Sequence, residues 1–179
     1  MFYKTRIKRV IDLIFSSAFL ILLSPILLII IILIKLDSKG PVLFAQKRLG
    51  INEQIFTILK FRSMTHKNHS INEQIFEGDS RVTKVGKVLR RLKLDELPQL
   101  LNVLKGDMSI IGPRPCLPEI KAKFGKYANQ RLKVKPGLSS LAAVKGSIYL
   151  TWEEKGYYDE YYVNNISFKL DLNILIQTF

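Results

Sequence analysis

Two adjacent carboxylates, Asp95 and Glu96, are the residues of this sequence whose types and spacing best suit chemistry. Asp95 precedes Pro98 and an apolar run, a pattern that predicts a helix with Asp95 as its N-cap. A helix N-terminus donates N–H groups to a phosphate, and nearby cations keep a carboxylate ionised. An ionised aspartate can attack phosphorus, while the adjacent glutamate can hold a metal ion or move a proton. The alternative is that both carboxylates only stabilise the start of a helix.

Cationic residues that could hold a phosphate recur along the chain around this pair. Arg114 lies between Pro113 and Pro115, so its guanidinium is pre-oriented for a two-pronged contact with phosphate; otherwise it is a surface arginine in a rigid loop. A basic amphipathic helix is expected from Thr83 to Leu94, either on a membrane surface or beneath a phosphate site. The candidate phosphate- and nucleotide-binding residues are Lys60, Arg62, Arg90, Arg91 and Arg114.

The chain is strongly basic, with 28 Lys and Arg against 15 Asp and Glu and a formal net charge of +13. This excess predicts anionic partners, which are nucleic acid, acidic lipid head groups or phosphorylated substrates. With 179 residues the chain can form one compact domain plus a membrane element. A single cysteine, Cys116, excludes an internal disulfide and fits a reducing cytoplasm.

The apolar run from Val10 to Ile34, in which Asp12 is the only charge, is the element that must hold the chain at a membrane. As a helix it would be about 37 Å long against roughly 30 Å of hydrocarbon, so a straight transmembrane helix is one interpretation. However, Pro25 has no N–H and breaks a helix, and the Ser24 hydroxyl can satisfy a freed backbone group. Both flanks are basic, so lysine and arginine favour neither orientation. We therefore expect a helix–break–helix that enters one leaflet and returns to the same face.

Two domains follow from this expectation: residues 1–37 as a basic arm and re-entrant membrane helix, and residues 38–179 as a cytoplasmic catalytic domain lying on the membrane face. Anionic membrane lipids are the expected surface. Asp12 needs a partner inside the apolar run, and Lys8 or Arg9 is expected to supply it. The apolar run is too long for a signal peptide, and residues 35–39 do not resemble a cleavage site, so the chain should stay attached by its N-terminus.

The remaining segments predict a mainly helical α+β domain with interfacial amphipathic helices and a small β-hairpin. Two short β-rich runs on either side of a turn at 49–52 indicate the hairpin. Aromatic residues over 152–163 suit either a membrane interface or a packed core. The expected elements are strands at 42–44 and 54–61, helices at 83–94, 94–104 and 119–133, a stop at Lys105-Gly106, and rigid turns at 112–118 and 135–140.

A polar loop is expected from Thr65 to Ser80. It contains His66 and His69, a spacing that indicates a metal site only weakly without further ligands, so a solvated loop is the preferred interpretation. The stretch Ile-Asn-Glu-Gln-Ile-Phe at 51–56 recurs at 71–76, which is too short for a repeat architecture.

Taken in order along the chain, these motifs resemble the small monotopic phosphoglycosyl transferases, the bacterial sugar transferase family. The resemblance covers nearly the whole chain, and its most specific part is the block from Leu94 to Pro115. The motifs that carry it are Lys8-Arg9-x-x-Asp12, Ser24-Pro25, Gln46-x-Arg48-x-Gly50, Lys60-Phe-Arg-Ser-Met64, Leu94-Asp-Glu-Leu-Pro-Gln-Leu-x-Asn-Val-Leu-Lys-Gly-Asp-Met-Ser109, Gly112-Pro-Arg-Pro115, Lys135-Pro-Gly137 and Tyr161-Tyr-Val-x-Asn-Ile-Ser-Phe-x-Leu-Asp171.

The resemblance implies transfer of a sugar 1-phosphate from a UDP-sugar to polyprenyl (undecaprenyl) phosphate, with release of UMP. It also implies Mg²⁺ as cofactor, a covalent aspartyl intermediate and a re-entrant helix with both ends cytoplasmic. Asp95 maps to the nucleophile, Glu96 to its partner and Arg114 to the element near the nucleotide phosphates, while Asp95 and Glu96 are also the candidate metal ligands. The implied location is the cytoplasmic face of the bacterial inner membrane, in the first membrane step of polysaccharide or glycoconjugate assembly.

The sequence departs from the family pattern after Lys135-Pro-Gly137, where the usual glutamine and arginine are missing and Ser147 stands at the arginine position. Lys145 could supply a displaced cation. Two rival functions remain: a non-catalytic membrane scaffold, suggested by this departure, and a basic lipid- or nucleic-acid-binding module, suggested by the net charge. The apolar N-terminal run disfavours nucleic acid, so an enzyme is the preferred hypothesis. The sequence leaves the sugar and the oligomeric state, including a homodimer, open.

Overall fold

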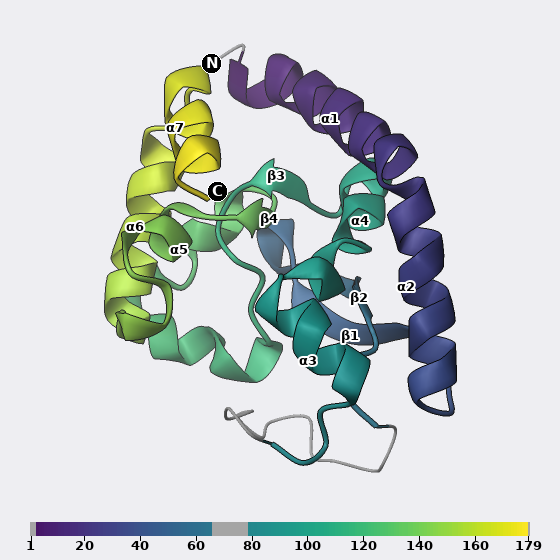
Figure 1. Ribbon diagram of the computed structural model, residues 1–179. Coiled ribbons are helices and arrows are strands. Elements are labelled where there is room, and N and C mark those ends of the chain that lie inside the picture. The colour runs from purple at the N-terminus through teal and green to yellow at the C-terminus, as the bar shows by residue number, and fades with distance from the viewer. Residues whose placement is uncertain (1–2, 66–78, 179) are drawn as a thin grey trace.

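The computed structural model describes residues 3–65 and 79–178 and has mainly helical architecture with small sheets (Figure 1). Helices α1 and α2 follow one another along one side, α6 and α7 lie on the opposite side, and the strands lie between them. The helices are α1 Lys8–Leu22, α2 Ser24–Asp37, α3 Lys84–Arg91, α4 Gln99–Lys105, α5 Leu141–Lys145, α6 Trp152–Asn164 and α7 Phe168–Thr178. The strands are β1 Leu43–Leu49, β2 Ile55–Phe61, β3 Ser109–Ile111 and β4 Gly137–Ser139.

Several short helical turns complete the described chain. A π-helical turn, Tyr3–Ile7, leads into α1, and the other turns are of the 3-10 type: η2 Ile51–Glu53, η3 Leu94–Glu96, η4 Pro118–Tyr127, η5 Gln130–Lys133 and η6 Ser147–Tyr149. The single helix expected over 119–133 is wrong in type, because this segment forms η4 and η5 and is kinked at Gly125, whose φ is +54°. His66, His69 and the repeat at 71–76 lie outside the described residues.

The break expected at Ser24-Pro25 separates α1 from α2. The two helices are bent by 63° there. In a continuous helix the N–H of residue 25 would bond the carbonyl of Ile21, and Pro25 has no N–H to give. The Ser24 hydroxyl donates to that same carbonyl at 2.8 Å, which satisfies it locally as predicted. Within the described residues, no helix alone is both long enough and apolar enough to cross a bilayer. The bent pair α1 and α2, taken together, has the required length and apolar composition.

Asp12 is buried, and its expected pairing with Lys8 or Arg9 is wrong. Its carboxylate accepts hydrogen bonds from Ser109 Oγ at 2.8 Å and from the Ile110 N–H at 3.0 Å. The reason is that α1 packs against α4 and β3, which brings backbone and hydroxyl donors closer than the helix's own cations. Lys8 instead forms an ion pair of 2.7 Å with Asp171 of α7, which ties the start of α1 to the C-terminal helix.

The predicted hairpin is present as β1 and β2, which pair antiparallel with Leu43 opposite Phe61 and Leu49 opposite Ile55. Strand β1 is longer than expected and includes Gln46 and Arg48. Together, α2, β2 and α3 share an apolar core, listed by its buried members as Ile30, Ile34, Phe61 and Leu89. This core fixes β2 beside the bent helix pair.

Helix α3 begins where the sequence predicted, with Thr83 as N-cap accepting from the Gly86 N–H at 2.9 Å. Its apolar side chains do not form one buried face. Leu89 is buried, whereas Val88 and Leu92 are 55% and 59% exposed. The amphipathic helix therefore packs on α2 through Leu89 and presents Val88 and Leu92, among its cations, to the surroundings.

The aromatic stretch in α6 is divided between core and surface. Tyr162 is fully buried, and its hydroxyl donates to Asp171 at 2.7 Å and lies 3.1 Å from the Ile111 carbonyl. Tyr157 and Tyr161 are exposed. Core packing is thus confirmed for Tyr162, while the membrane-interface interpretation of the exposed tyrosines stays a prediction, since successive positions of a helix face different sides.

Candidate active site

Asp95 and Glu96 lie in η3, the tight turn between α3 and α4. The expectation that Asp95 caps a helix is wrong, because α4 begins at Gln99 and Pro98 stands at its N-cap position. A cap at Asp95 would bond the N–H of residue 97 or 98, and Pro98 has no N–H. Lys93 adopts a left-handed conformation with φ of +55°, which turns the chain sharply before the two carboxylates. A tight turn rather than a helix start therefore presents them.

Glu96 is the anionic centre of the site. Its Oε1 accepts from Lys60 Nζ at 2.8 Å and forms an ion pair with Arg114 Nη2. Burial alone would raise the pKa of Glu96, but Arg114 and Lys60 outweigh it and hold that pKa at about 2. Glu96 is therefore an anion at neutral pH, which suits ion pairing and metal binding better than proton transfer.

Asp95 has a different environment from its neighbour. Burial, together with the charge of Glu96, raises the pKa of Asp95, while Lys60 and Arg90 oppose this rise. None of the described side chains donates a hydrogen bond to its carboxylate. The expected cations are thus present, but they only moderate the effect of burial. Asp95 is a partly desolvated carboxylate that pairs with no described side chain, which leaves it available as a nucleophile.

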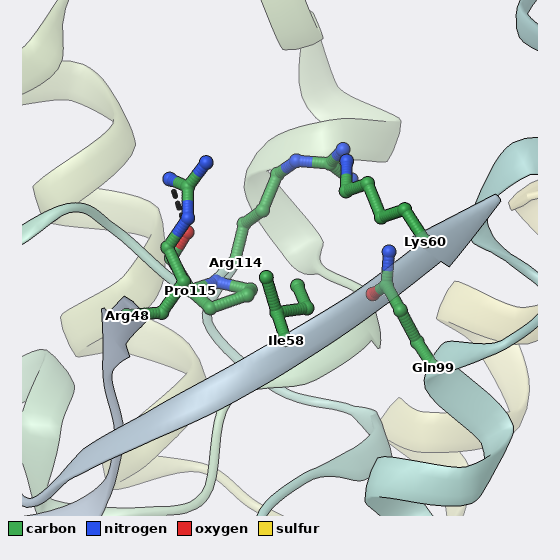
Figure 2. A pocket seen from close by; sticks show the side chains of 6 residues that line it. All are labelled: Arg48, Ile58, Lys60, Gln99, Arg114 and Pro115. Atoms are coloured by element: carbon green, nitrogen blue, oxygen red, sulfur yellow. Dashed lines mark hydrogen bonds between the residues drawn. The ribbon is translucent and has the colours of Figure 1, made fainter. Parts of the chain in front are cut away.

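Lys60 and Arg114, the two partners of Glu96, line a polar pocket (Figure 2). Lys60 from β2 and Arg114 from the proline-rich loop extend toward one another across it, and Gln99 points up from the start of α4. Arg48 lies on the side of Pro115, whose carbonyl it contacts at 3.5 Å. The lining residues are Arg48, Ile58, Lys60, Gln99, Arg114 and Pro115. Three cations against one paired glutamate make this pocket suited to an anion such as a phosphate.

The sequence predicted two of these lining residues, Lys60 and Arg114, and missed Arg48 and Gln99. Arg48 is held in place by a hydrogen bond of 2.5 Å from its Nη2 to Gln46. Burial, and then the charge of Arg114, lower its pKa. The alternation of a strand, which places Gln46 and Arg48 on one face of β1, is the signal that could have found it. Gln99 is only 2% exposed, and its position after Pro98 gave no indication of a pocket.

Arg62 does not belong to the pocket, which corrects the prediction that it binds phosphate. It is buried, and its guanidinium donates to the carbonyls of Ser38 at 2.7 Å, Ile34 at 3.1 Å and Pro41. Arg62 therefore satisfies carbonyls at the end of α2. In a continuous strand Lys60 and Arg62 would share a face, but β2 ends at Phe61 and that alternation stops.

Of the other two predicted phosphate-binding cations, only Arg90 acts on the site. Arg90, in the last turn of α3, acts electrostatically on Asp95, whereas Arg91 is exposed and outside the pocket lining. Lys145 and Ser147 are exposed and are also not among the lining residues. The structure thus brings Asp95, Glu96, Lys60, Arg114 and Arg90 together.

A desolvated aspartate near a cationic pocket is an arrangement suited to chemistry at phosphorus. The chain belongs to the bacterial sugar transferase family, whose sequence pattern matches residues 3–179, and it is a phosphoglycosyl transferase. The resemblance of its motifs is thereby confirmed.

Three curated relatives illustrate this membership. The uncharacterized sugar transferase EpsL of Bacillus subtilis is 41% identical over 172 residues, which are 96% of this chain and 85% of that protein. The UDP-N-acetylgalactosamine-undecaprenyl-phosphate N-acetylgalactosaminephosphotransferase of Aeromonas hydrophila is 42% identical over 96% of this chain and 42% of its own length. The UDP-glucose:undecaprenyl-phosphate glucose-1-phosphate transferase of Klebsiella pneumoniae is 43% identical over 96% of this chain and 39% of its own length.

Proposed function

We propose that this chain transfers a sugar 1-phosphate from a UDP-sugar to polyprenyl phosphate and releases UMP. The observation that carries the proposal is the position of Asp95, which pairs with no described side chain, next to Glu96, the partner of the pocket cations Lys60 and Arg114. The printed names of the Aeromonas and Klebsiella relatives, which describe transfer to undecaprenyl phosphate, support the same reaction class.

The proposed reaction consists of two displacements at the phosphorus that carries the sugar. First, an Asp95 oxygen attacks this phosphorus and forms a bond to it. The bond between the phosphorus and the oxygen that bridges the two phosphates breaks, and UMP leaves with the electrons of that bond. Second, a phosphate oxygen of the polyprenyl phosphate attacks the same phosphorus and displaces Asp95 as a free carboxylate. The product is a polyprenyl diphosphate sugar, and the enzyme is regenerated.

The pocket cations have distinct roles in this proposal. Arg114 and Lys60 would bind the diphosphate and stabilise the charge that develops on the departing UMP. Arg48 would neutralise the far side of the same group. Glu96, which holds Lys60 and Arg114 in place, is the positioning anion of the pocket.

Mg²⁺ fits the residues present and is part of the proposal. Within the described chain no cluster of three acidic, histidine or cysteine side chains exists, but Mg²⁺ is commonly held by one or two carboxylates together with substrate phosphates. Asp95 and Glu96 would supply those carboxylates. The ion would add positive charge at the diphosphate.

We further propose that α1 and α2 form a re-entrant element in the bacterial inner membrane, with both ends on the cytoplasmic face. The support is the 63° bend and the run of exposed apolar side chains along both helices. Those with the largest exposed fractions are Ile14, Ile21, Leu22, Leu28 and Leu36. Anionic lipids would attract the basic arm before α1.

The proposed reaction is tested by incubating the protein with Mg²⁺, polyprenyl phosphate and each of a panel of UDP-sugars, and measuring UMP. We expect UMP and a polyprenyl diphosphate sugar with one of them. A non-catalytic scaffold or a lipid- or nucleic-acid-binding module would release no UMP with any sugar. That result would refute the proposal.

Arg90→Gln is expected to move the acidic limb of the kcat/KM profile to higher pH. Only ionised Asp95 can attack, so activity rises as pH increases through its pKa. Arg90 opposes the rise of that pKa, and its removal therefore raises the pKa further. Arg91→Gln, on an exposed neighbour outside the pocket, is the matched control and should leave the limb in place. Equal shifts in both variants would show only a general effect of net charge.

Arg114→Lys should lower kcat/KM about 30-fold, which corresponds to about 2 kcal/mol of transition-state stabilisation. The charge is retained, but lysine lacks the planar fork that contacts two phosphate oxygens at once. The same change at the exposed Arg91 is the control and should stay within about twofold of the parent. Activity of Arg114→Lys within that same range would mean that Arg114 does not hold phosphate through its fork.

A further inference from the structure

The loop that carries Arg114 is fixed by hydrogen bonds from donors on other segments of the chain. Pro113 and Pro115 have no N–H, so the loop has few donors of its own with which to fix its shape. Instead, each of the four successive carbonyls from 113 to 116 accepts a hydrogen bond from elsewhere. In that order, the donors are Gly137 N at 3.0 Å, Arg131 Nη2 at 2.6 Å, Arg48 Nη1 at 3.5 Å and Leu49 N at 2.9 Å.

The donor to the Arg114 carbonyl is itself rigidly fixed. Arg131 is 3% exposed, and its Nε donates to Asp159 of α6 at 2.8 Å. The guanidinium carbon also lies 3.8 Å from the centre of the Phe124 ring. Asp159 is likewise 3% exposed. One guanidinium thus joins helix α6 to the backbone of a pocket residue.

A buried ion pair by itself is weak evidence for stability, because apolar side chains of similar volume often do as well. The third contact, from Arg131 to the Arg114 carbonyl, distinguishes this pair from a purely structural one. Moving that carbonyl would turn the backbone from which the Arg114 side chain extends toward Glu96 and the pocket. Only a planar fork with several donors can reach both Asp159 and this carbonyl, so lysine is not equivalent.

We propose that Arg131, oriented by Asp159, is a positioning residue that sets the placement of Arg114 over the substrate phosphates. The inference rests on the proposed function for its effect on turnover, and on the geometry alone for its effect on the loop. Misplacement of a substrate-binding group by about 1 Å can cost on the order of 100-fold in rate. The Arg131 contact should therefore matter for catalysis only while Arg114 is present.

The test uses a paired variant, Arg131→Met with Asp159→Leu, which removes both buried charges together and preserves packing. We expect kcat/KM to fall about 10- to 100-fold in the parent background. In the Arg114→Ala background the same pair should change kcat/KM by less than about twofold, because the positioned group is gone. Arg131→Lys, which keeps a charge for Asp159, should reproduce most of the loss. Equal losses in both backgrounds would refute the positioning role.

Hydrogen exchange in the substrate-free protein separates this inference from the proposed function. In the paired variant the amides of Gly137 and Leu49, which donate to the Pro113 and Cys116 carbonyls of this loop, should exchange at least several-fold faster, while those of α6 stay protected. Thr151→Ala, which removes the capping hydroxyl of α6, is the control: it should loosen α6 without changing the Arg114 loop. Unchanged exchange at Gly137 and Leu49 in the paired variant would overturn the inference even with an active enzyme. Faster exchange there without UMP release by the parent would leave the loop contact standing and refute the transferase.

Discussion

Asp95→Asn is expected to abolish turnover, by at least about 1000-fold, and to leave the fold intact. Asparagine has nearly the same size, but its amide cannot attack phosphorus. The substitution should not weaken α4, because Asp95 makes no capping hydrogen bond to that helix. Loss of a desolvated carboxylate should, if anything, slightly stabilise the turn, since burial disfavours its charged form.

The measurement is made without the lipid acceptor. Protein, Mg²⁺ and the correct UDP-sugar should give up to one UMP per active site, together with a mass increase of one sugar phosphate on the peptide that contains Asp95. Both signals should be absent in Asp95→Asn. Asp37→Asn is the matched control, because Asp37 lies away from the pocket and accepts from the Val85 N–H at 2.9 Å, a bond that an asparagine oxygen can also accept. Full activity of Asp95→Asn would eliminate the covalent mechanism.

The parts of the fold that the sequence predicted best are those determined by local chemistry. The missing N–H of Pro25 and the adjacent Ser24 hydroxyl fix the break between α1 and α2. Gly106, with φ of +96°, ends α4 where expected, because glycine readily adopts this left-handed conformation. These features need no knowledge of distant residues.

The sequence predictions that proved wrong concern residues whose conformation or partners are determined by tertiary contacts. Asp12 finds its partners on β3, far along the chain, rather than on its own helix. Arg62 resembles a phosphate ligand in sequence, but β2 ends just before it and the side chain turns to the carbonyls at the end of α2. The expected helix over 119–133 is replaced by two 3-10 segments, and the first of them is kinked at Gly125, whose φ is positive. No local pattern contains this information.

The candidate site also contains some residues that the sequence predicted and others that only the folded structure shows. Asp95, Glu96 and Arg114 could be selected from the sequence, because the carboxylate pair stands at a predicted helix start with many cations around it and the arginine stands between two prolines. The ion pairs that join Glu96 to Lys60 and Arg114 depend on the hairpin, the η3 turn and the proline-rich loop meeting at one point. Arg48 and Gln99 enter the pocket for that same reason. Their roles follow from the assembled fold and could not be read from any one motif.

Replacing Ser24 by Ala and Pro25 by Leu should convert the bent helix pair into one straight transmembrane helix. Proline in a helix interior costs about 3 kcal/mol or more, and leucine removes this cost and restores the N–H to the Ile21 carbonyl. The continuous apolar helix is then about 37 Å long, which exceeds the roughly 30 Å of hydrocarbon. The short arm before α1 should consequently move to the periplasmic face, while the larger basic domain stays in the cytoplasm.

Labelling of an exposed cysteine introduced by Lys4→Cys reports the side that the arm occupies, because the native Cys116 is buried. An impermeant thiol reagent added to intact cells should label the straightened variant and not the parent. Ser17→Ala with Ala18→Leu makes the same type of change at exposed positions inside α1, where the helix is continuous, and should leave the arm protected. Labelling of the parent from outside would show that the arm is already periplasmic, and the re-entrant arrangement would then be wrong.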